Sequence, residues 1–316
     1  MAKDNSKNVL IFSTAEQAIL TTILYSDIFS FPLTKEELWK WLISGKKLSK
    51  AVFAGALSNL KNKLVFKNGY FCLKGREVII ERRVKNLSEV TKKRRIAERV
   101  AQKLAHIPSV LFIGISGGLA AGNVLPEDDI DFVIIVKENT LFITRLFILG
   151  ILECLGVRRS RNQKDTSDTI CVNLIFDETS LSWFAKTQDL YTARELAQII
   201  PLFERDAMYQ RFMTANNWIE RFLPNSMLIS SLSKQNSMTH DMSIDKKRGE
   251  MFLYKIVNNL SAEIISRVLQ ISFMKRHRTR EVLSKNLLAF HPIDYRTKTL
   301  RMLRLKMRQL GLLTNF

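Results

Sequence analysis

The sequence predicts an α+β protein built from several domains. Helical periodicity and one hairpin signal dominate up to about residue 77, strand-length apolar runs lie between 106 and 180, and helical patterns follow. Apolar residues at helical spacing predict helices, whereas short runs rich in Ile and Val predict buried strands. The 316 residues suffice for two or three domains with substantial cores. The expected domains cover residues 1–77, 78–105, 106–180 and 181–316.

Residues 14–75 carry three helical patterns followed by a hairpin. Thr34-x-x-Glu37 has the form of a capping box, which predicts the start of the second helix. Asn68-Gly69 between two short apolar runs is a strong signal for a tight hairpin turn. Three helices and a hairpin in this length resemble the winged helix-turn-helix fold. The resemblance implies either a DNA-binding unit or a packing and protein-contact module. The DNA interpretation places the third helix in the major groove and uses Lys50, Lys61, Lys63 and Lys67 on phosphates.

Residues 78–105 predict one long connecting helix that is rich in Lys and Arg. Acidic residues interrupt the basic ones, so the segment is not a pure polycation. It is either a solvated helix face with internal ion pairs or a track for nucleic acid.

Asp129 and Asp131 are the most informative residues of the chain. They open the apolar run 130–136, and a similar run, 110–115, ends just before Ser116-Gly117-Gly118. Residues i and i+2 of a strand point to the same face, about 6.5–7 Å apart along the chain. Two carboxylates there are costly to bury unless a cation neutralises them, and hard oxygen ligands of this kind suit Mg²⁺ or Mn²⁺.

This arrangement resembles the DNA polymerase beta-like nucleotidyltransferase superfamily. Its signature is a strand, a Gly-Gly or Gly-Ser turn, a spacer, and an acidic pair separated by one apolar residue. Here the turn is Gly117-Gly118, the spacer is 119–128, and the pair is Asp129 and Asp131. The resemblance implies a small mixed-sheet catalytic domain over 106–180 in which both aspartates hold Mg²⁺ or Mn²⁺.

The same resemblance implies a role for the glycine turn and for its neighbours. The backbone around Ser116, Gly117 and Gly118 is expected to cradle the β- and γ-phosphates of a nucleoside triphosphate, because only glycine permits so close an approach. The Ser116 hydroxyl adds a further hydrogen bond. Arg158 and Arg159, in a charged loop, are candidates to balance the remaining negative charge.

The family's third carboxylate lies on a later strand, and the matching position here is Asn173 in the apolar run 169–176. An Asn side chain ligates a metal weakly and cannot accept a proton. Asp177, further along the same run, could substitute only if the strand bends or ends early, and Asp168, just before it, is another substitute without positional support. Asn173 therefore completes the expected site with reduced catalytic competence.

Three functional hypotheses stay open. The first is metal-dependent transfer of a nucleoside monophosphate from a nucleoside triphosphate to an acceptor, with nucleic acid as one candidate. The second is a catalytically impaired protein that binds nucleotide or nucleic acid without turnover. The third is an enzyme that nucleotidylates a small molecule or a protein. The net charge of +19 favours a polyanionic partner such as RNA or DNA. The nucleotide base and the oligomeric state are left open.

The cysteines and the hydropathy pattern bear on location. Cys72, Cys154 and Cys171 lie in apolar contexts without a CxxC motif, which is typical of core thiols in a reducing compartment. The most hydrophobic segment, 141–157, carries charged residues and is too short to span a membrane. We expect a cytoplasmic location and no membrane span.

From about residue 181 onward the pattern predicts a basic helical domain. The loop 225–243, rich in Ser and Asn, is expected to be mobile. The basic run 275–280 and an arginine stripe in the last helix suit phosphate contacts, although such a stripe is also what a solvated face presents. The expected helices are 189–200, 207–222, 247–269 and 295–312, and the stripe consists of Arg301, Arg304 and Arg308.

Overall fold

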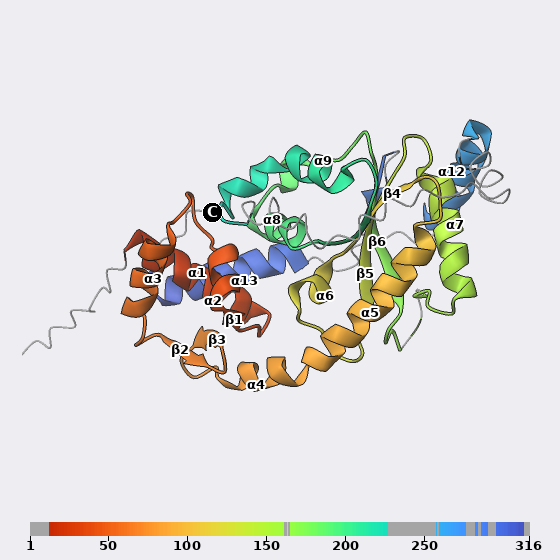
Figure 1. Ribbon diagram of the computed structural model, residues 1–316. Coiled ribbons are helices and arrows are strands. Elements are labelled where there is room, and N and C mark those ends of the chain that lie inside the picture. The colour runs from red at the N-terminus through yellow and green to blue at the C-terminus, as the bar shows by residue number, and fades with distance from the viewer. Residues whose placement is uncertain are drawn as a thin grey trace, which may run out of the picture.

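The computed structural model describes residues 13–160, 163, 165–226, 257, 259–275, 282–283, 286–289 and 295–312. In this part of the chain, helices and two β-sheets form a mixed α+β fold (Figure 1). The basic run over 276–280, most of the loop 225–243 and the first part of the predicted helix 247–269 lie outside the described residues.

The N-terminal unit contains the predicted helices and hairpin. Thr34 accepts a hydrogen bond from the backbone N–H of Glu37 at 3.1 Å, and the Glu37 carboxylate accepts one from the Thr34 N–H at 2.9 Å, which confirms the capping box. Asn68 and Gly69 both have positive φ, as a two-residue hairpin turn requires. The elements are α1 (Thr14–Ile28), β1 (Leu33–Thr34), α2 (Lys35–Lys40), α3 (Lys50–Asn59), β2 (Leu64–Lys67) and β3 (Tyr70–Leu73), with the strands in the antiparallel order β1-β3-β2.

The predicted connecting helix is present as two helices, α4 (Val78–Lys85) and α5 (Leu87–Leu104), which are separated by one residue. Arg83 of α4 forms a two-bonded ion pair with Glu37 of α2, at 2.6 and 2.7 Å, and so holds α4 to the N-terminal unit. α5 then runs along the central sheet (Figure 1). Lys93, one of the basic residues of this predicted helix, is fully buried.

The central sheet is mixed, as predicted, and has the strand order β7-β4-β5-β6-β9-β8. Among the described strands of this sheet, β5 and β6 pair in parallel and the other neighbours are antiparallel. The strands are β4 (Val110–Ile115), β5 (Ile130–Val136), β6 (Ile170–Asp177), β7 (Ile200–Glu204), β8 (Val282–Leu283) and β9 (Leu287–Ala289).

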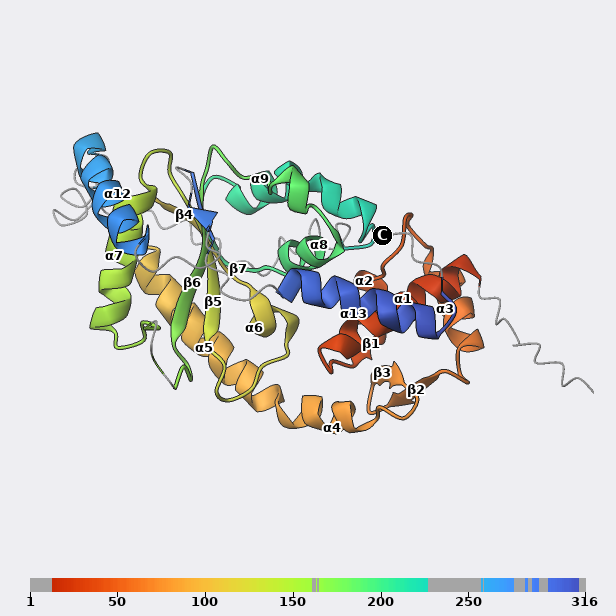
Figure 2. The ribbon, with the colours of Figure 1, turned by 180° about the vertical axis from the view of Figure 1, so that it is seen from behind.

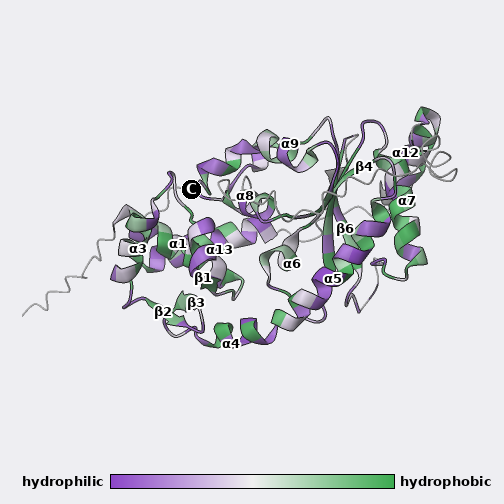
Figure 3. Ribbon diagram, in the orientation of Figure 1, coloured by the Kyte–Doolittle hydropathy of each residue, from purple (hydrophilic) through white to green (hydrophobic). Residues whose placement is uncertain are grey.

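Helices cover both faces of this sheet. On one face, Ile113 and Ile134 pack in a core with α5 and with α7 (Leu141–Cys154), and α7 is largely green, that is hydrophobic, in Figure 3. On the other face, Phe112 and Val133 belong to a core that also contains α8 (Leu190–Ala197), α9 (Met208–Ala215) and α1. The N-terminal unit and the sheet therefore share one continuous core.

The segment 181–316 is not wholly helical, which corrects the prediction. β7, β8 and β9 come from this segment and extend the sheet on both sides. The predicted helix 207–222 ends at Ala215 and continues as the 3₁₀ turn Asn217–Arg221. α12 (Leu260–Lys275) packs on α7, and α13 (Tyr295–Gln309) lies against α1 and α8 (Figure 2). Among the described helices, none combines the length and the hydropathy needed to cross a bilayer.

Candidate active site

The strand pairing brings the two predicted motifs together. β4 ends at Ile115, which pairs with Phe132 of the antiparallel β5. The backbone N–H of Ser116 donates to the carbonyl of Asp131 at 2.9 Å, so the Gly117-Gly118 turn lies beside the start of β5. The turn opens the short helix α6 (Gly117–Ala121), and Gly117 adopts a left-handed φ of 61°. The glycine turn and the aspartate pair form one local structure.

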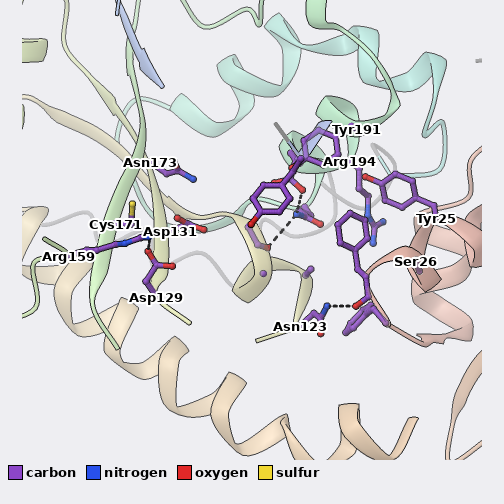
Figure 4. A pocket seen from close by; sticks show the side chains of 18 residues that line it. Tyr25, Ser26, Asn123, Asp129, Asp131, Arg159, Cys171, Asn173, Tyr191 and Arg194 are labelled. Atoms are coloured by element: carbon purple, nitrogen blue, oxygen red, sulfur yellow. Dashed lines mark hydrogen bonds and ion pairs between the residues drawn. The ribbon is translucent and has the colours of Figure 1, made fainter. Parts of the chain in front are cut away.

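The third strand places Cys171 opposite Asp131. β5 and β6 run parallel with Asp131 paired to Cys171, and the register shifts between Val172 and Leu174, which leaves Asn173 in the bulge. Oxygens of Asp129 and Asp131 and the sulfur of Cys171 lie within 4.8 Å of one another. Asn173 also faces the site (Figure 4). The sequence prediction for Asn173 thus identified a residue that lines the site but missed Cys171.

Cys171 corrects the prediction of three core thiols. Cys72 is buried, but Cys154 is exposed and Cys171 is half-buried at the edge of the site. Burial and the nearby carboxylates of Asp131 and Asp129 raise the pKa of the Cys171 thiol to about 12. At neutral pH Cys171 is therefore a neutral neighbour of the aspartates rather than a thiolate.

Asp131 is poorly stabilised as a carboxylate. Its burial, followed by the negative charges of Asp129 and Glu195, raises its pKa to about 7, and only Arg159 and the thiol of Cys171 oppose this. Two close carboxylates in a partly buried site favour a cation between them. The oxygen donors of both aspartates, with the Asn173 amide on the same face, fit a hard divalent cation.

Arg159 forms an ion pair with Asp129. No other described residue forms an ion pair with this aspartate. Arg159 reaches the site from the loop after α7, while its neighbour Arg158 points away and pairs with Glu153 at 3.0 Å. Of the two arginines that the sequence offered as charge partners, only Arg159 lines the site.

The fully buried Lys93 holds together the two segments that lead into β5 and β6. The ammonium group of Lys93 donates to the carbonyls of Pro126 and Asp128, at 3.0 and 2.7 Å, and to the Asp168 carboxylate at 3.0 Å. These acceptors immediately precede β5 and β6. Asp168 is therefore a structural partner of Lys93 and lies outside the candidate site, contrary to its use as a substitute third carboxylate.

Asp177 is structural as well. It lies at the opposite end of β6, where it pairs with Val136, and its carboxylate accepts hydrogen bonds from the N–H of Asn139 at 3.0 Å and of Thr179 at 2.9 Å. Neither substitute supplies a third carboxylate, which leaves Asn173 and Cys171 as the residues that β6 offers to the site.

The aspartates line one end of a cavity of about 400 Å³ (Figure 4). Gly117 and Gly118 form part of its wall, whereas Ser116 is buried and its hydroxyl donates to the Asp131 carbonyl at 3.5 Å. The sequence missed the opposite walls, because they come from remote segments. One wall comes from the end of α1 and the residues that follow it, namely Tyr25, Ser26, Phe29 and Phe31. The other comes from α8 and its C-cap, namely Tyr191, Arg194, Glu195 and Gln198, and from Tyr295 of α13.

Glu195 adds a second unusual carboxyl group to this cavity. Burial raises its pKa to about 7, against the opposing charge of Arg194. Gln198, the residue that caps the C-terminus of α8, donates to Glu195 at 3.1 Å and to the Gly117 carbonyl at 3.5 Å. α8 thereby contacts the glycine turn directly.

Comparison of the chain with protein-family models, with curated proteins and with solved structures finds no match.

Proposed function

We propose that the chain is a metal-dependent nucleotidyltransferase, which moves a nucleoside monophosphate from a nucleoside triphosphate to an acceptor. The observation that carries the proposal is the contact between the glycine turn and the aspartate pair at the mouth of one cavity. Two carboxylates for a divalent cation and a backbone turn for phosphates are the parts that such a transfer needs.

In this proposal Asp129 and Asp131 hold Mg²⁺ or Mn²⁺, which when bound neutralises the charge that develops on the phosphates. Gly117 and Gly118 present backbone to the β- and γ-phosphates. Arg159, released from Asp129, contacts the triphosphate, since its guanidinium is already at the site.

The reaction joins an acceptor oxygen to the α-phosphorus and breaks the bond between that phosphorus and the β-phosphate, so that pyrophosphate leaves. The proton of the acceptor hydroxyl passes to solvent in this proposal, and β6 offers no base for it, since neither the Asn173 amide nor the Cys171 thiol takes up a proton at neutral pH.

A second candidate is nucleotide binding without turnover. The specific observation in its favour is that β6 presents only the neutral side chains of Asn173 and Cys171 to the cavity, with Asp177 and Asp168 both engaged elsewhere.

One experiment separates the two candidates. The protein is incubated with each α-³²P-labelled nucleoside triphosphate, Mg²⁺ or Mn²⁺, and a mixture of small cellular metabolites or total cellular RNA. Label transfer by wild type, lost in Asp129→Asn and Asp131→Asn, is the result expected of the enzyme. The Asn173→Asp variant restores a carboxylate on β6 and is expected to raise the transfer rate. Metal-dependent triphosphate binding without transfer, even in Asn173→Asp, would establish the binding protein instead.

A further inference from the structure

Arg194 and Tyr25 lie together at the end of the cavity that faces away from Asp129 (Figure 4). Both side chains are more than nine-tenths buried, with exposed fractions of 7% for Arg194 and 4% for Tyr25. Among the described residues, Nη1 of Arg194 and the hydroxyl of Tyr25 have no hydrogen-bond partner. A buried cation and a buried hydroxyl without partners are costly, which points to a ligand that supplies the missing acceptor.

The two carboxylates whose charge acts on Arg194 already have other partners. Glu37 pairs with Arg83 at 2.6 Å, and Glu195 accepts from Gln198 at 3.1 Å. Instead, the guanidinium stacks on the ring of Trp41, with 3.9 Å between its central carbon and the ring centroid. That contact holds the group in place without satisfying its N–H donors.

Arg194 stays charged inside the cavity and acts on a second cation. Burial lowers the pKa of Arg194 to about 10, so the guanidinium is still protonated at neutral pH. The pKa of the nearby Lys40 is also lowered. Burial is the largest cause, and the positive charge of Arg194 is the second. An anion at this end of the cavity would relieve both effects.

We propose that Arg194 and Tyr25 bind an anionic group, a phosphate or a carboxylate, of a small-molecule acceptor. The position of Arg194, almost fully buried in the wall of the cavity, favours a small molecule over a nucleic-acid chain. The assignment of this molecule as the acceptor rests on the proposed nucleotidyl transfer, whereas the anion site itself does not.

The test is calorimetric titration of inorganic phosphate and, separately, of acetate into the full chain at fixed ionic strength. Wild type is expected to bind at least one of the two anions, and the preferred one indicates whether the acceptor carries a phosphate or a carboxylate. Arg194→Gln is expected to weaken that binding at least about tenfold, since one charge-assisted contact is lost.

Two further variants keep the test decisive. Tyr25→Phe removes one hydroxyl without disturbing the stack on Trp41 and is expected to weaken anion binding several-fold. Arg158→Gln, which changes an arginine that pairs with Glu153 and does not line the cavity, is expected to leave it unchanged. The proposal is overturned if wild type binds neither anion, or if Arg194→Gln binds both anions as tightly as wild type does.

The last part of the test measures binding of a labelled single-stranded RNA oligonucleotide to wild type and to Arg194→Gln. Binding of the RNA that depends on Arg194, without binding of either small anion, would replace the small molecule by a polymer and overturn the proposal. Because these readouts need no turnover, anion binding without label transfer would refute the proposed enzyme alone. Label transfer without Arg194-dependent anion binding would refute the anion site alone.

Discussion

The Cα of Gly117 lies directly against the carboxylate of Asp131. A Cβ atom at position 117 would stand 2.5 Å from Oδ2 of Asp131, which is closer than real side chains approach. Gly117 also has the left-handed φ of 61°, which L-residues rarely adopt. Two independent constraints thus demand glycine here, and both arise from the close approach of the turn to the aspartate pair.

Gly117→Ala is expected to displace the Asp131 carboxylate and to abolish metal-dependent triphosphate binding. The left-handed backbone adds a loss of stability of about 1–2 kcal/mol. Isothermal titration and denaturant unfolding measure the two effects. Gly150→Ala is the matched control, because a Cβ there meets no atom within 4 Å and glycine is unfavourable inside a helix. Normal triphosphate binding by Gly117→Ala would show that the turn does not shape the site.

Asp131→Asn is expected to stabilise the metal-free protein at pH 8 while it abolishes metal binding. The folded protein holds the Asp131 proton up to about pH 7, whereas the unfolded chain releases it near the ordinary aspartate value. Stability of wild type therefore falls as pH rises between about 4 and 7. The variant is expected to be more stable by about 1 kcal/mol at pH 8, after allowance for partial solvent exposure.

Denaturant unfolding in the presence of a chelator, at pH 4.5 and at pH 8, measures this difference. The gain is expected to vanish at pH 4.5, and the part of the pH dependence that belongs to Glu195 is expected to remain. Asp177→Asn is the contrasting variant. Its carboxylate accepts hydrogen bonds with both oxygens, so the amide is expected to cost about 1–3 kcal/mol. Equal effects of the two substitutions would contradict the distinction between a site carboxylate and a structural one.

Arg159→Gln is expected to tighten Mn²⁺ binding a few-fold, because it frees Asp129 from its ion pair, and to weaken triphosphate binding. Calorimetry with Mn²⁺ alone and then with a non-hydrolysable triphosphate separates the two. Arg158→Gln, one residue away, removes only a surface pair with Glu153 and is expected to change neither. Unaltered binding in both variants would place Arg159 outside the working site.

Lys93→Met is expected to destabilise the protein by about 3–5 kcal/mol, because the Asp168 carboxylate and two backbone carbonyls lose their buried partner. The loops that lead into β5 and β6 are then released, so triphosphate binding is also expected to weaken. The control is Lys92→Met, which removes a half-exposed contact to the same Asp168 and is expected to destabilise the protein far less. Thermal unfolding compares the two. A similar small effect in both would mean that burial of Lys93 contributes little.

Local sequence patterns predicted the local structure. The Thr34 capping box, the Asn68-Gly69 turn and the strand that begins after Asp129 all depend on residues within a few positions of one another. The same holds for the glycine turn beside the aspartate pair, since an antiparallel pair of strands brings their connected ends together. Strands β7 and β9 were missed because each is short and is held in the sheet by partners far away in the sequence.

By itself, the sequence determined the two aspartates, the glycine turn and the mixed sheet that carries them. Only the tertiary structure decided that a bulge at Asn173 places Cys171 opposite Asp131, that Lys93 is buried, and that Arg194 meets Tyr25 across the cavity. The physical reason is the separation along the chain of the residues that determine each feature. Spacing along a chain encodes which face a side chain takes on its own element, whereas strand register and the packing of α1 and α8 against the sheet depend on contacts between distant segments.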